Sequence, residues 1–455
     1  MSQYRVAVVG ATGAVGSEMR RLLRDRAYPA SEIVPFASER SAGRELDDGL
    51  VVQGLVDDER LDGFDVAIFS AGGSVSKAWA PRFAARGAIV VDNSSAFRMD
   101  PGVPLVVSEV NPEALDHIDK GIVANPNCTT MAIMPPLHAL HEEFGLVGMV
   151  ATSFQAAGGA GQKGMDELLA QVPGLLADPQ ALAQRGAEAA ARVGETPVFG
   201  KPLAFNVVPL LGKDTGNGYT DEEMKLQNES RKILGIPELA VSPTCVRVPV
   251  MVGHAVEVKA TFEREPSVER ALAVMGAHAG VELDDVPTPL EWAGKDPVAV
   301  GRVRADLADA KSLNMFVVGD NLLKGAALNT VQIAELLHER GLIGSRAAAF
   351  PPQGSGQLVT VVLVAEPTLS ASIVMSPAFQ LTELAMSTTE QRSATPAPAG
   401  TVRAALSTIC SVPPLLGIKP LPWLATAPLT SRSQLMTDPD AGGVLLYRPA
   451  RAVSR

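Results

Sequence analysis

Blocks of apolar residues alternate with helix-like stretches along the first 130 residues. The blocks are short and rich in valine and isoleucine, as is typical of strands buried in a parallel sheet. Predicted strands cover residues 4–9, 33–37, 66–71, 88–92, 105–107 and 122–124, and predicted helices cover 17–26 and 75–86. Strands that alternate with helices favour a parallel, doubly wound sheet.

The pattern changes after residue 130. A mostly apolar helical segment at 131–140 is followed by predicted strands at 150–156, 245–250 and 255–262, and by predicted helices at 165–176, 179–191 and 327–340. In the last of these strands the apolar residues take alternate positions. His254 falls in phase with them, so its ring should point inward.

Charge and periodicity are both lost from about residue 344. Residues 344–455 hold 13 charged side chains in 112 positions, against 76 in the first 343. An apolar patch at 359–364 suits a strand, but strands and helices do not alternate regularly here. This tail is either a spurious, out-of-frame extension or a genuine appended segment, and the intact mass of the native protein distinguishes the two.

Composition narrows the class of protein. A length of 455 residues suggests two or three domains, and a net charge of −11 without a lysine or arginine cluster argues against nucleic acid or an anionic membrane as a partner. Three cysteines, with no Cys-x-x-Cys or His-x-x-x-His spacing, make neither a disulfide framework nor a metal site. The chain starts with a strand rather than a signal peptide and has no run of ~20 apolar residues, so we expect a cytoplasmic protein.

A glycine-rich turn at residues 10–16 follows the first predicted strand and opens a helix. Glycines there allow a dinucleotide pyrophosphate to approach the backbone, although the same pattern fits a tight turn without a ligand. After the second strand, Arg40 with the hydroxyls of Ser38 and Ser41 suits the 2′-phosphate of NADP. Glu39 suits the ribose hydroxyl of NAD, and Arg40 alone would pass for an ordinary surface arginine.

Cys128 lies between the strand at 122–124 and the helical segment at 131–140, within Asn-Pro-Asn-Cys-Thr-Thr. The start of a helix favours a thiolate, whereas a cysteine without a chemical role is usually a small buried residue. Pro135 and Pro136 should kink or break this helix and leave only a turn to support the thiolate.

Four polar residues stand out beside this cysteine. Gln155 lies in an apolar run, Arg247 alternates with valines, His254 points inward, and Arg98 follows a polar turn. An arginine binds carboxylates bidentately and a histidine transfers protons near neutral pH. Taken singly, each also fits a structural role, as a backbone hydrogen bond, an ion pair or a packed ring.

The chain resembles the aspartate-semialdehyde dehydrogenases, in the family's order, over about residues 4–341. Asparagine at position 127 differs from the glycine typical of N-acetylglutamyl-phosphate reductase, the nearest relative. The matching segments are 10–16, 38–43, 93–98, 125–130, 155–161, 245–249, 253–254 and 319–328.

This resemblance implies a fold like that of glyceraldehyde-3-phosphate dehydrogenase. A Rossmann-type, doubly wound NADP-binding domain would cover residues 1–130, and a helix within 321–343 would return to it. An α+β catalytic and dimerisation domain with a mixed sheet would cover 131–320. The tail 344–455 is unmatched, and we expect it to be disordered or a spurious extension. A homodimer is implied, with a tetramer as the alternative.

The resemblance also implies NADPH-dependent reduction of 4-aspartyl phosphate to aspartate 4-semialdehyde, with release of phosphate, in the synthesis of lysine through diaminopimelate, threonine, methionine and isoleucine. Cys128 would attack, His254 would manage the proton, Gln155 would orient the substrate, and Arg247 would bind its carboxylate. The rival hypotheses are an N-acetylglutamyl-phosphate reductase-like enzyme and a non-catalytic NADP-binding protein.

The remaining implied contacts are of three kinds. Glu222 would meet the substrate ammonium, and Arg98, Asn127 and Lys225 would bind phosphate, although Glu222 and Lys225 also fit a solvated helix start. The implied cofactor contacts are Gly10, Thr12, Gly13, Ala14, Val15, Ser38, Arg40, Ser41, Gly158, Gly159 and Asn321, the last of which also fits a turn asparagine.

Overall fold

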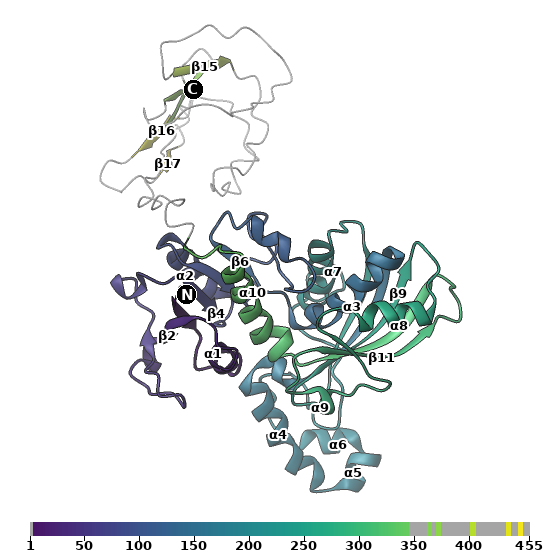
Figure 1. The fold of residues 1–455 in the computed structure, drawn as a ribbon. Coiled ribbons are helices and arrows are strands. Elements are labelled where there is room, and N and C mark those ends of the chain that lie inside the picture. Colours follow the sequence, from purple (N-terminus) through teal and green to yellow (C-terminus); the bar gives the residue numbers. More distant parts are fainter. Residues whose placement is uncertain are drawn as a thin grey trace, which may run out of the picture. The chain divides into compact units, whose positions relative to one another are not determined.

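The structure is a computed structural model that describes residues 3–344 and five strands further along the chain. The chain divides into two compact units, residues 1–352 and 353–455 (Figure 1). The described strands of the second unit are β13 Val362–Ala365, β14 Ser370–Val374, β15 Thr401–Ala405, β16 Gln434–Thr437 and β17 Leu445–Arg448. The predictions of a disordered or spurious tail fall almost wholly outside the described residues.

The first sheet has six strands, all parallel, in the order β3-β2-β1-β4-β5-β6. This is the Rossmann order, and it confirms the predicted doubly wound sheet. Its strands are β1 Tyr4–Val9, β2 Ala30–Ala37, β3 Gln53–Gly54, β4 Val66–Phe69, β5 Ile89–Asp92 and β6 Ile122–Ala124.

The predicted strand at 105–107 is wrong. Leu105 makes an isolated bridge to Ala124, and the segment otherwise runs as a buried loop. Side-chain amides replace a strand partner here, because Asn111 bonds the Val107 N–H and the Leu105 carbonyl at 2.9 Å each. The apolar run therefore lies beside β6 with a single bridge to it, and Asn111 takes backbone bonds that a longer strand ladder would have made.

Helices cover both faces of the first sheet. On β1, Ala7 and Val9 share a core with α2, whereas Val6 and Val8 share one with α1 and α10. The helices and short helical turns of this region are α1 Ala14–Asp25, η1 Glu39–Ser41, η2 Glu59–Leu61, α2 Gly73–Ala85, η3 Pro112–Asp116, η5 Leu323–Ala327 and α10 Leu328–Glu339. The last helix thus returns from the end of residues 3–344 to the first sheet.

The second sheet is mixed, as predicted, with the order β10-β11-β12-β9-β7-β8. Helices α3, α7 and α8 pack against one face of this sheet (Figure 1). The elements are α3 Cys128–Phe144, β7 Leu146–Gln155, α7 Asp221–Leu234, β8 Ala240–Arg247, β9 His254–Phe262, α8 Val268–Gly276, β10 Val281–Leu283, β11 Val298–Ala305 and β12 Ser312–Gly319.

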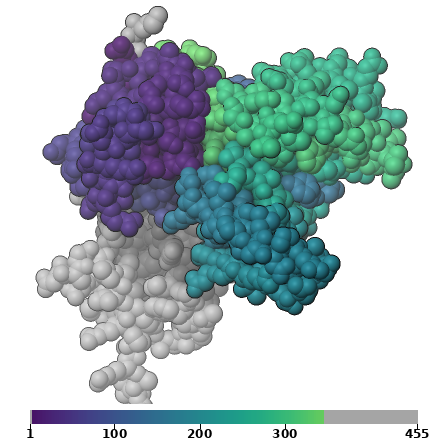
Figure 2. Space-filling model, turned by 90° about the horizontal axis from the view of Figure 1, so that it is seen from below, coloured from purple at the N-terminus to yellow at the C-terminus, as the bar shows by residue number. Residues whose placement is uncertain are grey.

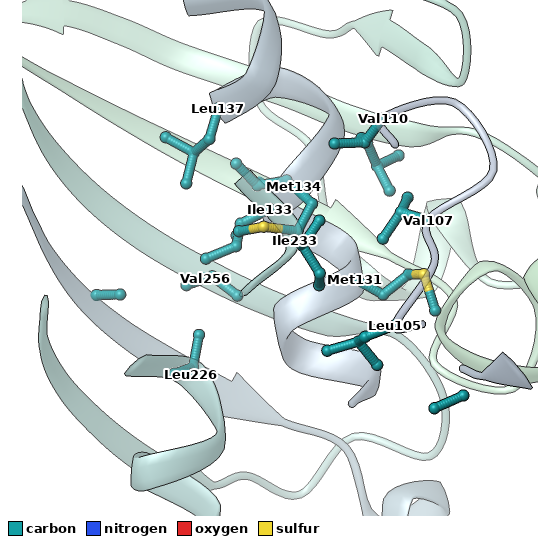
Figure 3. Packing of buried hydrophobic residues seen from close by; sticks show 14 of the residues in the cluster. Leu105, Val107, Val110, Met131, Ile133, Met134, Leu137, Leu226, Ile233 and Val256 are labelled. Atoms are coloured by element: carbon teal, nitrogen blue, oxygen red, sulfur yellow. The ribbon is translucent and has the colours of Figure 1, made fainter. Parts of the chain in front are cut away.

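Helix α3 runs without a break through Pro135 and Pro136, so the expectation that these prolines would break it is wrong. Most of its side chains are buried, and they pack between the loop at 105–110, α7 and β9 (Figure 3). Contacts on all sides hold the segment helical although two backbone N–H groups are missing. The full helix therefore supports the residue at its start.

A small helical lobe follows β7. It contains η4 Ala157–Ala160, α4 Gln162–Leu176, α5 Pro179–Gln184 and α6 Gly186–Ala191, and α9 Pro289–Trp292 lies nearby. The helix predicted at 179–191 is divided at Arg185, whose backbone leaves the helical region at φ −136° and ψ 55°. In Figure 2 the lobe, in blue, extends below the green second-sheet region. No helix in the described part of the chain has the length and apolar character to cross a membrane.

Candidate active site

The glycine-rich turn lies where the strand order of the first sheet reverses, between the ends of β1 and β4. Gly10 has a φ of +86°, and a Cβ added there would lie 2.2 Å from the carbonyl oxygen of Ser70. A Cβ on Gly16 would lie 2.2 Å from the Gly10 oxygen. Helix α1 starts after Gly13 without a side-chain cap, so the N–H groups of its first turn are available to a ligand.

The predicted 2′-phosphate contacts lie beside this turn. Ser38, Arg40 and Ser41 follow β2, and the Gly10 N–H bonds the Phe36 carbonyl of β2 at 2.8 Å. Arg40 is exposed, and within residues 3–344 it makes no ion pair or side-chain hydrogen bond. A free cation beside an open helix start fits a phosphorylated dinucleotide, with Thr12, Ala14 and Val15 supplying the backbone of the turn.

Cys128 is the first residue of α3, and Asn127 caps the helix. The Asn127 Oδ1 accepts the backbone N–H groups of Thr129 and Thr130 at 2.9 and 3.3 Å. On the other side, a Cβ on Gly325 of η5 would lie 2.8 Å from the Cys128 Cβ. Only a glycine allows this approach, so η5 fixes the place of the thiol.

The thiol of Cys128 is held in its protonated form. Burial and the negative charge of Glu222 raise its pKa to about 11, against the opposing charges of Arg98, Arg247 and Lys225. The thiolate expected from the helix start is therefore not the resting state. A ligand that neutralises Glu222 would remove one of the two causes.

His254 starts β9, and its side chain is fully buried, as predicted. Its Nδ1 accepts the Ala156 N–H at 3.1 Å, so a neutral ring carries its hydrogen on Nε2. Burial and the nearby charge of Arg247 lower the pKa of His254 to about 3, which keeps the ring neutral at pH 7. The Nε2 atom has no hydrogen-bond partner among the described residues. The Nε2–H group can therefore donate a hydrogen bond to a ligand.

Arg247 and Gln155 are register partners at the carboxyl ends of β8 and β7. The Arg247 Nη1 donates to the Ala156 carbonyl at 2.7 Å, and the Gln155 Nε2 donates to Ser153 Oγ at 3.2 Å and Glu222 Oε1 at 3.4 Å. A Cβ on Gly159 would lie 2.8 Å from Arg247 Nη1. The strand ends and the turn after β7 thus meet at one place.

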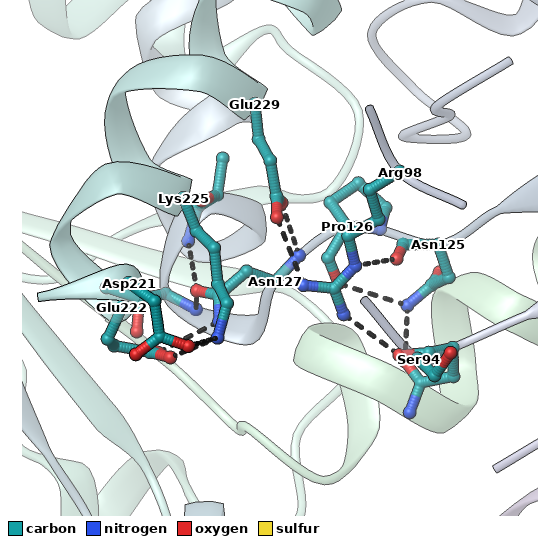
Figure 4. A network of polar contacts seen from close by, with 12 residues as sticks. Ser94, Arg98, Asn125, Pro126, Asn127, Asp221, Glu222, Lys225 and Glu229 are labelled. Carbon is teal, nitrogen blue, oxygen red and sulfur yellow. Dashed lines mark hydrogen bonds and ion pairs between the residues drawn. The ribbon is translucent and has the colours of Figure 1, made fainter. Parts of the chain in front are cut away.

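Glu222 of α7 joins several of the predicted residues. Its Oε1 accepts Asn127 Nδ2 at 2.9 Å, and its Oε2 accepts the Lys225 ammonium at 2.8 Å (Figure 4). Burial alone would raise its pKa, but Lys225 and Asn127 lower the pKa of Glu222 to about 2. The carboxylate is therefore ionised and faces Gln155 and Asn127, not solvent.

Arg98 is buried beneath the same loop, with Glu229 as its ion-pair partner at 3.1 Å. The Glu229 Oε2 also accepts the Asn127 backbone N–H at 2.6 Å. The sequence interpretation did not identify Glu229. Its spacing from Glu222 and Lys225 is the signal that was available, because positions i, i+3 and i+7 share one face of a helix.

A second buried ion pair lies on the other side of the 125–128 loop and was also missed. The ammonium of Lys324, 1% exposed in η5, bonds Glu109, Gln332, Asn329 and Ser108. Asn329 in turn donates to Asn125 Oδ1 at 2.7 Å. Lys324 therefore ties the turn that carries Gly325 to the loop that carries Cys128.

The predicted residues form one cluster and two flanking groups. The cluster at the starts of α3 and α7 and the ends of β7 and β8 contains Arg98, Asn127, Cys128, Gln155, Glu222, Lys225, Arg247 and His254. Gly158, Gly159 and Asn321 lie on its His254 side, where a Cβ on Gly158 would lie 3.5 Å from Asn321 Nδ2. That buried Nδ2 has no partner among the described residues. The other group is the turn beside β1 and β2.

Two family models match the chain, and their descriptions agree with the two sheets. The model described as semialdehyde dehydrogenase, NAD binding domain, matches residues 5–118. The model described as semialdehyde dehydrogenase, dimerisation domain, matches residues 137–324. Together they cover more than half of the chain.

Curated and solved relatives extend over the same region. The aspartate-semialdehyde dehydrogenase of Streptomyces akiyoshiensis is 52% identical over 335 residues, which cover 73% of this chain and 98% of that protein. Aspartate semialdehyde dehydrogenase II of Vibrio cholerae, solved in complex with ASA, is 41% identical with a TM-score of 0.70, over 74% of this chain and 99% of that one. The enzyme of Candida albicans, solved with NADP, is 26% identical with a TM-score of 0.58, over 75% and 100%.

Proposed function

The chain belongs to the aspartate-semialdehyde dehydrogenase family, and we propose that it reduces L-4-aspartyl phosphate to L-aspartate 4-semialdehyde with NADPH and releases phosphate. The observation that carries the proposal is the convergence of Cys128, His254, Arg247 and Gln155 around one site. A thiol, a neutral imidazole donor and an arginine without a carboxylate partner are what a thioester route for a carboxylate-bearing acyl phosphate needs.

Substrate binding uses the charges of the cluster. Arg247 binds the α-carboxylate, and Gln155 orients the acyl group. The substrate ammonium approaches Glu222 and competes with Lys225 for its oxygens. Lys225 is thereby released toward the phosphoryl group, which Arg98 and Asn127 also bind.

Neutralisation of Glu222 lowers the pKa of the Cys128 thiol, because it removes the anion that opposes the thiolate. The thiolate sulfur then attacks the acyl carbon, a carbon–sulfur bond forms, and the carbon–oxygen bond to phosphate breaks. The departing phosphate keeps the electron pair of that bond. The start of α3 and its cation neighbours stabilise the charge as it moves from sulfur to phosphate.

A bound NADPH, held by the turn at 10–16 and the residues after β2, would supply the hydride for the thioester carbonyl carbon. The His254 Nε2–H donates to the carbonyl oxygen as that oxygen becomes an alkoxide. Because the His254 ring is buried, this hydrogen bond is strong. Collapse of the thiohemiacetal breaks the carbon–sulfur bond and returns the thiolate. Asn321, Gly158 and Gly159 lie beside His254, where we place the nicotinamide end of the cofactor.

The preference for NADPH over NADH rests on Arg40, Ser38 and Ser41. A free arginine beside the second strand suits a 2′-phosphate, and a relative of this chain was solved with NADP. We further propose a cytoplasmic homodimer that serves the synthesis of lysine through diaminopimelate, threonine, methionine and isoleucine. The dimer is supported by the match of residues 137–324 to a dimerisation-domain model.

The reverse reaction tests the proposal. We expect purified full-length protein to reduce NADP with aspartate semialdehyde only when phosphate is present, and to be much slower with NAD. Cys128→Ala should abolish this activity, while Cys245→Ala, which alters a buried cysteine outside the cluster, should keep it. Preference for N-acetylglutamate semialdehyde, or full turnover by Cys128→Ala, would contradict the proposed reaction or its covalent route.

A further inference from the structure

Glu229 is a buried carboxylate to which the proposed mechanism gives no role. It is 1% exposed and lies on α7, one turn after Lys225. Each of its oxygens accepts one hydrogen bond, from the Asn127 backbone N–H at 2.6 Å and from Arg98 Nη1 at 3.1 Å. Both partners donate, so Arg98 and the Asn127 N–H favour the ionised acid, against the burial that raises the pKa of Glu229.

Arg98 is fixed in orientation by three acceptors around its guanidinium. Besides Glu229, the carbonyl oxygens of Asn125 and Asn93 accept Nε at 2.8 Å and Nη2 at 2.9 Å (Figure 4). A guanidinium has five N–H donors, so two donors, one on each terminal nitrogen, have no acceptor in this set. One remaining N–H on each terminal nitrogen of a rigid plane gives Arg98 a two-donor fork, which suits a tetrahedral oxyanion.

The same carboxylate also fixes the start of α3. Through the N–H of Asn127 it holds the residue that caps the helix, and Asn127 in turn orients the N–H groups of Thr129 and Thr130. One side chain therefore sets the position of the Arg98 fork relative to the N-terminus of the helix that carries Cys128. These are the two groups that a phosphoryl oxygen next to that cysteine would meet.

We propose that Glu229 is a positioning residue for the phosphoryl subsite, which aligns Arg98 and the start of α3 and thereby sets the affinity for inorganic phosphate and similar tetrahedral oxyanions. This rests on the proposed function, which places phosphate at Arg98. Glu229 itself does not touch the ligand. Its negative charge instead prevents Arg98 from turning toward another acceptor.

Calorimetric titration of the full-length protein with inorganic phosphate tests the proposal without the need for turnover. Glu229→Gln replaces one acceptor oxygen by an amide that faces Arg98 or the Asn127 N–H, so one donor loses its partner. We expect phosphate binding at least about tenfold weaker, and a similar rise in the KM for phosphate in the reverse reaction. The KM for aspartate semialdehyde should change less than about threefold, because Arg247 and Gln155 are untouched.

Two further variants separate positioning from folding. Glu229→Asp keeps the charge on a shorter side chain and should recover part of the phosphate affinity. Glu223→Gln alters a neighbouring acid of α7 that caps the helix and lies outside the subsite. It should lower the melting temperature without weakening phosphate binding.

Phosphate affinity within about twofold of wild type in folded Glu229→Gln would overturn the proposal, and so would Glu229→Asp binding phosphate no better than Glu229→Gln. The same result follows if the KM values for phosphate and aspartate semialdehyde rise together, since that is the signature of general damage. Wild-type protein that binds phosphate more tightly than Glu229→Gln but reduces no NADP would count against the proposed reaction and leave this positioning role supported.

Discussion

Arg98 and Lys324 are both buried cations, each paired with a glutamate, and they lie on opposite sides of the loop at 125–128. The ammonium of Lys324 has three protons, and four acceptors of the protein surround it. The guanidinium of Arg98 has five N–H groups, and three acceptors surround it. Lys324 is saturated and acts as an internal tie, whereas Arg98 retains donors for a ligand.

The comparison shows how a buried cation is best interpreted. Burial and an ion-pair partner are common to both residues, so neither property indicates binding. Ligand binding is indicated instead by the number of N–H donors of the cation that have no acceptor within the protein. By this measure the ligand lies on the α7 side of the loop at 125–128, where Arg98 has donors to spare. On the η5 side, Lys324 only holds the loop in place.

The largest effect should come from removing the saturated cation. Lys324→Met leaves the Glu109 charge buried without its partner, and we expect the free energy of unfolding to fall by about 3–5 kcal/mol. Denaturant titration measures it. Lys120→Met, which removes an exposed ion pair with Asp100, should cost no more than about 1 kcal/mol. A loss below that value for Lys324→Met would show that the pair is not a structural tie.

A smaller effect, on kcat more than on the free energy of unfolding, should follow when a side chain is added to η5 beside Cys128. Gly325→Ala places a Cβ 2.8 Å from the Cys128 Cβ, so the sulfur must move. We expect kcat to fall by roughly 10- to 100-fold. Gly186→Ala, where an added Cβ meets nothing within 4 Å, is the matched control and should keep wild-type kcat. Equal rates for the two variants would mean that η5 does not position the thiol.

The smallest effect concerns the charge balance on the α7 side. Glu222 is, after burial, the main cause that raises the Cys128 pKa to about 11, so Glu222→Gln should lower that pKa, by roughly one unit or less. The rate of Cys128 alkylation by iodoacetamide can be measured by peptide mass at pH values between 7 and 11. The rise of this rate with pH should occur at lower pH in the variant than in the wild type. Glu238→Gln, an exposed acid, should leave the profile unchanged. A shift to higher pH for Glu222→Gln would reverse the assigned sign.

The first sheet could be predicted from the sequence because its strands are continuous apolar runs between glycine-rich turns. The second sheet was less accessible, since β11 and β12 alternate with polar residues and their pairing depends on distant segments. The wrong strand prediction at 105–107 also reflects contacts that the apolar pattern does not show. There the side chain of Asn111 makes hydrogen bonds to the backbone of the apolar run.

The site divides in a similar way. Cys128, Gln155, Arg247 and His254 were found as unusual residues in local patterns, and the structure brings them together, while their roles and the domain boundaries stay predictions. Glu229 was not found, because its partner Arg98 lies 131 positions away in the sequence. The spacing on α7 places Glu229 on the face of Glu222 and Lys225, but a local pattern does not identify a partner so far away in the sequence.

The return of α10 to the first sheet bears on how the protein is made. Leu328, Val331 and Leu337 complete the core that covers one face of strands β1 and β4, and Gly325 closes the surroundings of Cys128. A nascent chain that ends before these residues lacks both the cover of its first sheet and the wall beside its thiol. Synthesis proceeds from the N-terminus at about 5–20 residues per second. The first strands to leave the ribosome therefore wait for nearly the whole of residues 3–344 before their fold is closed.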